Sequence, residues 1–102
     1  MKINGLTVDT RAIADGLYAI ICERGEEPIV ALGMIPKWIM DLTENLVREK
    51  VIAESARQLG ITTEELKPYV DDNLLSETVN PILHEISLGI YAAAAEAGKL
   101  LV

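Results

Sequence analysis

The sequence contains no phenylalanine and only one tryptophan, one cysteine and one histidine. Without phenylalanine, the core must be aliphatic, assembled from isoleucine, leucine, valine and alanine. The single cysteine, Cys22, excludes an intrachain disulfide, is typical of a reducing compartment, and has apolar neighbours that predict its burial. The single histidine, His84, excludes a two-histidine metal site within one chain. We therefore predict no metal, no cofactor and no catalytic residue.

Basic residues are also scarce, since 9 Lys and Arg stand against 16 Asp and Glu. The resulting net charge of −7 disfavours binding to nucleic acid and to anionic membranes. Residues 1–5 contain no apolar segment typical of a signal peptide, and Glu96 and Lys99 interrupt the apolar C-terminal stretch. We expect a cytoplasmic protein without a membrane-spanning helix.

Hydrophobic residues, in contrast, make up 50% of the 102 positions. That length predicts one domain, residues 1–102, and the fraction is high for a small domain whose large surface must be covered by polar groups. The apolar surplus predicts a subunit interface, so we expect a homo-oligomer, most simply a dimer.

Local signals predict an all-α fold of four or five helices, bundle-like, with at most a short N-terminal β-hairpin. The pair Asn4-Gly5 between two short apolar arms is typical of a tight hairpin turn. Asp9 or Thr10 then caps a helix that runs to about Arg24. Glycines mark the expected helix ends: Gly25, Gly33 and Gly60.

Three further helices are indicated along the chain. The longest covers residues 36–59, and Thr62 with Glu65 forms a capping box for a short helix after it. Asn80 followed by Pro81 predicts the start of a terminal helix, because asparagine caps well and proline is tolerated at the first position.

Two segments are less regular. Residues 26–35 are consistent with either a short helix or a short buried strand, and periodicity does not decide between them. We favour a helix or irregular coil, because a strand here would need a partner. The acidic stretch of residues 71–73 is typical of a turn.

Apolar spacing predicts the buried face of each long helix. In the first helix the expected residues are Ile13, Leu17, Ile20 and Ile21. In the long helix they are Ile39, Leu42, Leu46, Ala53 and Ala56, with Met40, Val47 and Val51 widening the face.

The terminal helix carries two faces suited to close packing. One is formed by small residues at a spacing of four: Gly89, Ala93 and Ala97. The adjoining face is formed by Ile82, Ile86 and Ile90. We expect the small face to pack on the matching strip of the first helix, formed by Ala12, Gly16 and Ala19. The isoleucine face remains for the long helix or a second chain, and these six terminal-helix residues are our candidate two-fold interface.

The segment that joins residues 33 and 38 has two interpretations. Gly33 and Lys37, beside Trp38 at the amino end of the long helix, could contact an anion or another ligand. The structural alternative, which we favour, is that Gly33 ends one element, Pro36 begins the next, and Trp38 packs the junction.

Residues 52–69 resemble the helix-turn-helix pattern of DNA-binding regulators. The resemblance is carried by a small residue at Ala56, the turn at Gly60 and apolar residues around them. It implies a transcriptional regulator, but Glu64 and Glu65 lie where such proteins present phosphate and base contacts.

The composition therefore favours a non-enzymatic, homo-oligomeric protein that binds another protein or forms a structural subunit. The first alternative is the helix-turn-helix-like regulator. The second is a small helical enzyme with acidic residues at a subunit interface. Glu77, His84 and Glu85 could bind a metal at a two-fold interface, but we favour the explanation that they are polar residues near the start of an apolar helix.

Overall fold

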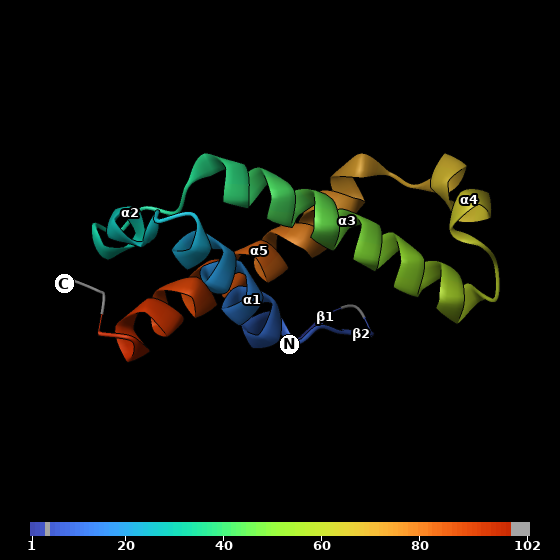
Figure 1. Cartoon of the computed structure of the whole chain (residues 1–102). Coiled ribbons are helices and arrows are strands. Elements are labelled where there is room, and N and C mark those ends of the chain that lie inside the picture. Colours follow the sequence, from blue (N-terminus) through green and yellow to red (C-terminus); the bar gives the residue numbers. More distant parts are fainter. Residues whose placement is uncertain (4, 99–102) are drawn as a thin grey trace.

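The computed structural model describes residues 1–3 and 5–98 and shows an all-α domain with a short N-terminal hairpin, as predicted (Figure 1). The elements are β1 (Lys2–Ile3), β2 (Leu6–Thr7), α1 (Thr10–Glu23), α2 (Glu27–Ala31), α3 (Lys37–Leu59), α4 (Thr63–Leu66), the 3₁₀ turn η1 (Lys67–Tyr69) and α5 (Asp72–Glu96). No helix in the described ranges is long and apolar enough to cross a membrane.

The helix ends follow the local signals closely. The Asp9 carboxylate accepts a hydrogen bond from the Ala12 amide at 3.0 Å and caps α1. Gly60 ends α3 at φ +71°, a left-handed conformation that glycine adopts without strain. Thr62 and Glu65 form the predicted capping box, in which each side chain bonds the other residue's backbone amide.

The prediction for the start of the terminal helix was wrong. Helix α5 begins at Asp72, and Pro81 lies inside it. Asp71, expected in a turn, is instead the N-cap, because its carboxylate accepts hydrogen bonds from the amides of Asn73 and Leu74. Proline removes one backbone hydrogen bond of the helix. The buried face of α5 nevertheless continues from Val79 past Pro81, and the packing of that face maintains the helix.

The ambiguous segment of residues 26–35 contains the short helix α2 over residues 27–31 and is turn or irregular chain outside it. Pro28 lies in the first turn of α2, where its missing amide hydrogen is no loss, and Gly33 follows the helix at φ +88°. The only strands in the described part of the chain are β1 and β2, which pair antiparallel with Ile3 opposite Leu6. Residues 1–3 and 5–98 contain no further strand that could pair with this segment.

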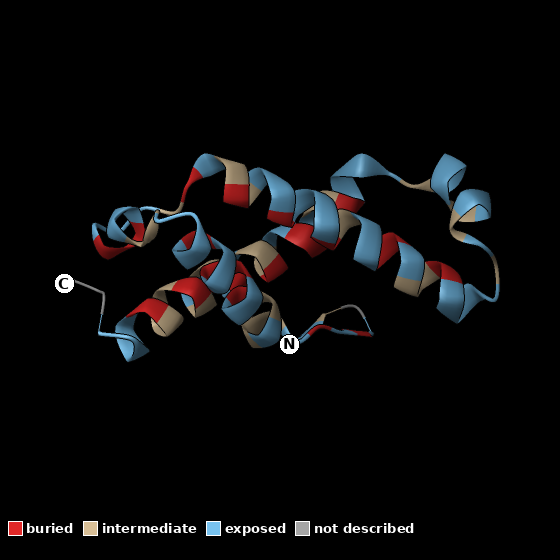
Figure 2. Cartoon of the chain, in the orientation of Figure 1, coloured by how far each residue is buried: buried red, intermediate tan, exposed pale blue. Residues whose placement is uncertain are grey.

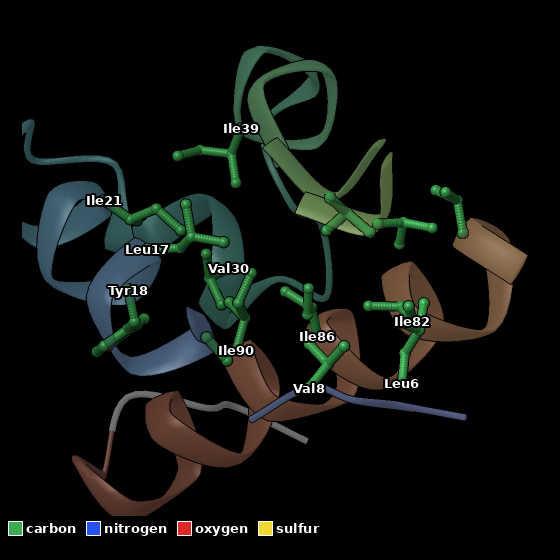
Figure 3. Close-up of a cluster of buried hydrophobic side chains, with 14 of the residues drawn as sticks. Leu6, Val8, Leu17, Tyr18, Ile21, Val30, Ile39, Ile82, Ile86 and Ile90 are labelled. Carbon is green, nitrogen blue, oxygen red and sulfur yellow. The ribbon is translucent and has the colours of Figure 1, made fainter. Parts of the chain in front are cut away.

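The core lies where α1, α3 and α5 meet, and the hairpin covers one edge of it (Figure 2). Figure 3 shows mainly aliphatic side chains, together with Tyr18, converging from these elements and from α2. The large hydrophobic residues of the core that are fully buried are Ile21, Val30, Ile39, Val47, Val79, Ile82, Ile86 and Ile90. Thr43 is also fully buried, because its hydroxyl donates a hydrogen bond to the Ile39 carbonyl at 2.6 Å.

Several residues predicted to be buried face solvent instead. Cys22 and Ile20 are exposed, because the buried face of α1 is formed by Ala14, Leu17, Tyr18 and Ile21. In α3 the buried residues are Ile39, Thr43, Val47, Val51, Ile52 and Ala56. This face turns around the helix as its neighbours change along α3, so Leu42, Leu46 and Ala53 are left outside.

The molecule is elongated, with extents of 45 × 22 × 21 Å and a radius of gyration of 15.1 Å. A compact domain of this length has a radius of gyration of about 13 Å. The C-terminal half of α3 extends beyond α1 and is accompanied there by the hairpin, α4 and the start of α5 (Figure 1).

Candidate functional site

The small-residue face of α5 packs very closely against α1. A β-carbon built on Gly89 would lie 2.6 Å from the Ala14 β-carbon, a distance that real β-carbons do not adopt. Close approach at Gly89 is therefore confirmed, but its predicted partner was wrong. Ala12, Gly16 and Ala19 are all exposed, since α1 turns its other face to the core.

The residues predicted for a two-fold interface separate into different environments. Ile82, Ile86 and Ile90 are 0% exposed within a single chain, in the same core cluster as residues of α1 and α3. The sequence left this isoleucine face to either the long helix or a second chain. In the structure it packs against the long helix, α3, and also against α1. Ala93 is half-buried and Ala97 is exposed. A second chain can therefore reach only the last part of this set directly.

The predicted ligand contacts at the start of α3 are occupied by the protein's own groups. The Gly33 carbonyl accepts a hydrogen bond from the Tyr91 hydroxyl at 2.8 Å, which fastens the loop to α5. The Lys37 ammonium lies 2.8 Å from the Asp41 carboxylate, and this hydrogen bond raises the pKa of Lys37.

Trp38 packs the same junction. Its indole N–H donates a hydrogen bond to Glu26 at 2.8 Å, and the Arg24 guanidinium lies 4.4 Å from the ring centroid. The three candidate residues thus bind three different neighbours, Tyr91, Asp41 and Glu26. This arrangement agrees with the structural interpretation of the segment.

Near the end of α1, the buried Tyr18 hydroxyl and one buried carboxylate oxygen of Glu27 form no well-aligned hydrogen bond with any described residue. Burial raises the pKa of the Tyr18 hydroxyl above its ordinary value, and the nearby Cys22 thiol and Glu27 carboxylate raise it further. Sequence reasoning missed this cluster, because its members come from two helices whose relative placement depends on tertiary packing.

The segment that resembles a helix-turn-helix forms a short α-hairpin. The turn at Gly60 is as predicted, but the second helix, α4, contains only four residues. Its Glu64 and Glu65 are exposed, and Lys67 pairs with Glu49 at 3.6 Å. This region therefore has little positive charge with which to bind the phosphates of a nucleic-acid groove.

The acidic residues do not assemble into a metal site. Within residues 1–3 and 5–98, no group of three or more Asp, Glu, Cys or His side chains is placed to hold an ion. On α3, Asp41, Glu44 and Glu54 each pair with a basic residue of the same helix.

A groove with an apolar lining lies between β2 and the C-terminal half of α3. It encloses a cavity of about 260 Å³, and its floor is formed by Leu6, Val8, Val47 and Val51. Lys50, Glu54 and Arg57 line it from successive turns of α3. Sequence reasoning did not find it, because it depends on where the hairpin docks.

Beside this groove, α3 exposes an apolar stripe, by which we mean Leu42, Leu46 and Ala53. These side chains lie within about 40° of one another around the helix. Leu42 is 39% and Leu46 53% exposed. The stripe consists of residues that their spacing predicted to be buried, and a single chain leaves them uncovered.

In comparisons with known proteins, no family model, no curated protein and no solved structure matches this chain. The function is therefore inferred from the geometry alone.

Proposed function

We propose that the protein is a non-enzymatic, cytoplasmic, homodimeric subunit that acts through protein interaction or as a structural component, and that two copies meet through the apolar stripe of α3. The single observation that carries this proposal is the exposure of Leu42, Leu46 and Ala53 on one face of the 23-residue helix α3. Covering an apolar face of this kind removes it from water, which stabilises the complex.

A second copy is the occupant that suits this face. The stripe runs along the long axis of a molecule that is 45 Å by 22 Å in profile, so two copies side by side have room for the about 800 Å² per partner typical of stable complexes. A two-fold axis that crosses α3 between Leu46 and Ala53 would place the larger side chain of each copy against the smaller one of the other. Such alternation of large and small residues permits close helix packing.

Light scattering coupled to size-exclusion chromatography tests the proposal. The wild-type protein is expected to elute with the mass of a dimer, and Leu46→Glu is expected to elute as a folded monomer, because it places a carboxylate at the centre of the stripe. The matched control is Leu59→Glu. Leu59 is a leucine of the same helix that is 65% exposed and lies about 140° around the helix axis from Leu46. This control should remain dimeric.

A wild-type protein that stays monomeric up to millimolar concentration would reject the dimer. Equal dissociation of both variants would show that the stripe is not the contact.

A further inference from the structure

The groove between β2 and α3 combines an apolar floor with a cation that the protein does not neutralise. Leu6, Val8, Val47 and Val51 are each less than a tenth exposed, although the cavity reaches them. The hairpin forms one wall, and Gln58 fastens it to α3 by donating a hydrogen bond to the Gly5 carbonyl at 3.3 Å. The cavity is thus supported from both sides by ordered elements.

The three charged residues along the groove differ in their pairing. Arg57 forms a two-pronged ion pair with Glu54, in which Nε lies 3.1 and 3.0 Å from the two carboxylate oxygens. That pairing raises the pKa of Arg57 and lowers the pKa of Glu54. Lys50 forms no ion pair or hydrogen bond with any described residue. The groove therefore carries one surplus positive charge in a chain whose net charge is −7.

We propose that this groove binds a small amphipathic monoanion, with its apolar body against the valine and leucine floor and a single carboxylate at Lys50. Charge complementarity selects the anion, since Lys50 is the one unpaired charge that faces the cavity among the described residues. Ala53 belongs both to the lining of the groove and to the apolar stripe, so the two sites adjoin. The inference is nevertheless argued from the hairpin and Lys50 and not from the exposed leucines of α3.

The size and charge of the groove exclude other occupants. A cavity of about 260 Å³ is too small for a helix of a partner protein, which is about 10–12 Å across. A phosphate group carries more charge than one lysine neutralises, and such groups are held by several backbone amides or an arginine fork. An apolar acid needs only one charged contact and a floor without polar groups.

The probes for a binding test are octanoate, octan-1-ol and octylamine, which share one apolar chain and differ in the charge of the head group. Two-dimensional NMR of the ¹⁵N- and methyl-labelled protein follows each titration. Octanoate is expected to shift signals of Leu6, Val8 and Val51 with a Kd on the order of 1 mM or tighter, a reasonable value for a ligand of ten heavy atoms. Octan-1-ol should bind about tenfold more weakly and octylamine more weakly still.

Two variants assign the head-group contact. Lys50→Gln should weaken octanoate binding about fivefold to tenfold and leave octan-1-ol unaffected. Lys37→Gln, a lysine on the same helix that faces Asp41, is the control and should change neither affinity.

Three results would overturn the proposal: octanoate shifts no groove signal, all three probes bind equally, or Lys50→Gln binds octanoate as wild type does. Because Leu46→Glu leaves the groove floor intact, a monomeric Leu46→Glu that still binds octanoate separates this site from the dimer contact.

Discussion

At the scale of single residues, Gly89 and Gly16 form a matched pair on two helices that pack together. A β-carbon on Gly89 would overlap the Ala14 methyl group, which cannot move without moving α1. A β-carbon on Gly16 would meet nothing within 4 Å, and Gly16 is not among the glycines with positive φ. One added methyl group therefore has opposite consequences at the two positions.

We predict that Gly89→Ala lowers the free energy of unfolding by about 1–3 kcal/mol through overpacking. Gly16→Ala should raise it by about 0.5–1 kcal/mol, because alanine has the higher helix propensity. Urea denaturation of both variants and the wild type measures the two changes. If Gly89→Ala is as stable as the wild type, α1 and α5 are not packed as closely as described.

The buried Tyr18 hydroxyl forms no well-aligned hydrogen bond within the described part of the chain, so its removal should not destabilise the protein. We predict that Tyr18→Phe raises the free energy of unfolding by about 1 kcal/mol at neutral pH, because the desolvation of an unpaired hydroxyl is avoided. The control is Tyr69→Phe at a tyrosine that is 85% exposed, where no change is expected.

The pKa of Tyr18 gives this prediction a pH dependence. A raised folded-state pKa means that the folded protein holds the phenolic proton more tightly than the unfolded chain does. The contribution of this tighter proton binding to the free energy of unfolding is fully present below the unfolded-state pKa of 10.0. It is lost as the pH rises through the higher folded-state pKa of Tyr18. The advantage of Tyr18→Phe over the wild type should therefore grow when urea denaturation is repeated above pH 10.0. An advantage independent of pH would contradict the burial of this hydroxyl.

At the scale of helices and strands, the ends of elements could be predicted from sequence better than their faces. The capping box at Thr62 and the left-handed glycine at Gly60 act within a few residues, so local chemistry decides them. The face that a helix buries depends on its neighbours. Leu42 and Ile39 are equally suited to burial by spacing, yet only Ile39 reaches the core.

Helix α5 shows the same division in one element. The pair of Asn80 and Pro81 is a good local start signal, but Leu75, Val79 and Ile82 continue one buried stripe across it. Tertiary burial of that stripe outweighs the loss of one backbone hydrogen bond. The groove beside β2 could not be predicted for the same reason, since the hydrogen bond that fastens the hairpin to α3 joins residues 53 positions apart, Gly5 and Gln58.

A pair of alanine substitutions locates the start of α5 in solution. We predict that Asp71→Ala lowers the free energy of unfolding by about 1 kcal/mol, because two amides of the first turn lose their acceptor. Asn80→Ala should be neutral or slightly stabilising, since Asn80 is an exposed residue in the middle of the helix. Thermal denaturation followed by circular dichroism measures both changes. The reverse order of effects would place the start of the helix at Pro81.

At the scale of the whole molecule, shape and net charge constrain how copies can associate. The charge of −7 opposes association, so any dimer contact must gain more from apolar burial than it loses by repulsion between two like-charged chains. Added salt screens that repulsion, and the proposed dimer should accordingly become tighter at higher ionic strength.

Small-angle X-ray scattering distinguishes the ways in which two elongated chains can meet. The apolar stripe lies along the flank of α3 and not at either tip of the molecule, so the proposed dimer is side by side. We predict a scattering mass of two chains with a maximum dimension only modestly above that of one chain, whose longest extent is 45 Å. Leu46→Glu should return the scattering mass to one chain at a similar maximum dimension. A doubled mass together with a nearly doubled maximum dimension would mean that the chains meet end to end, and the contact would then belong to the tips of the molecule rather than to Leu42 and Leu46.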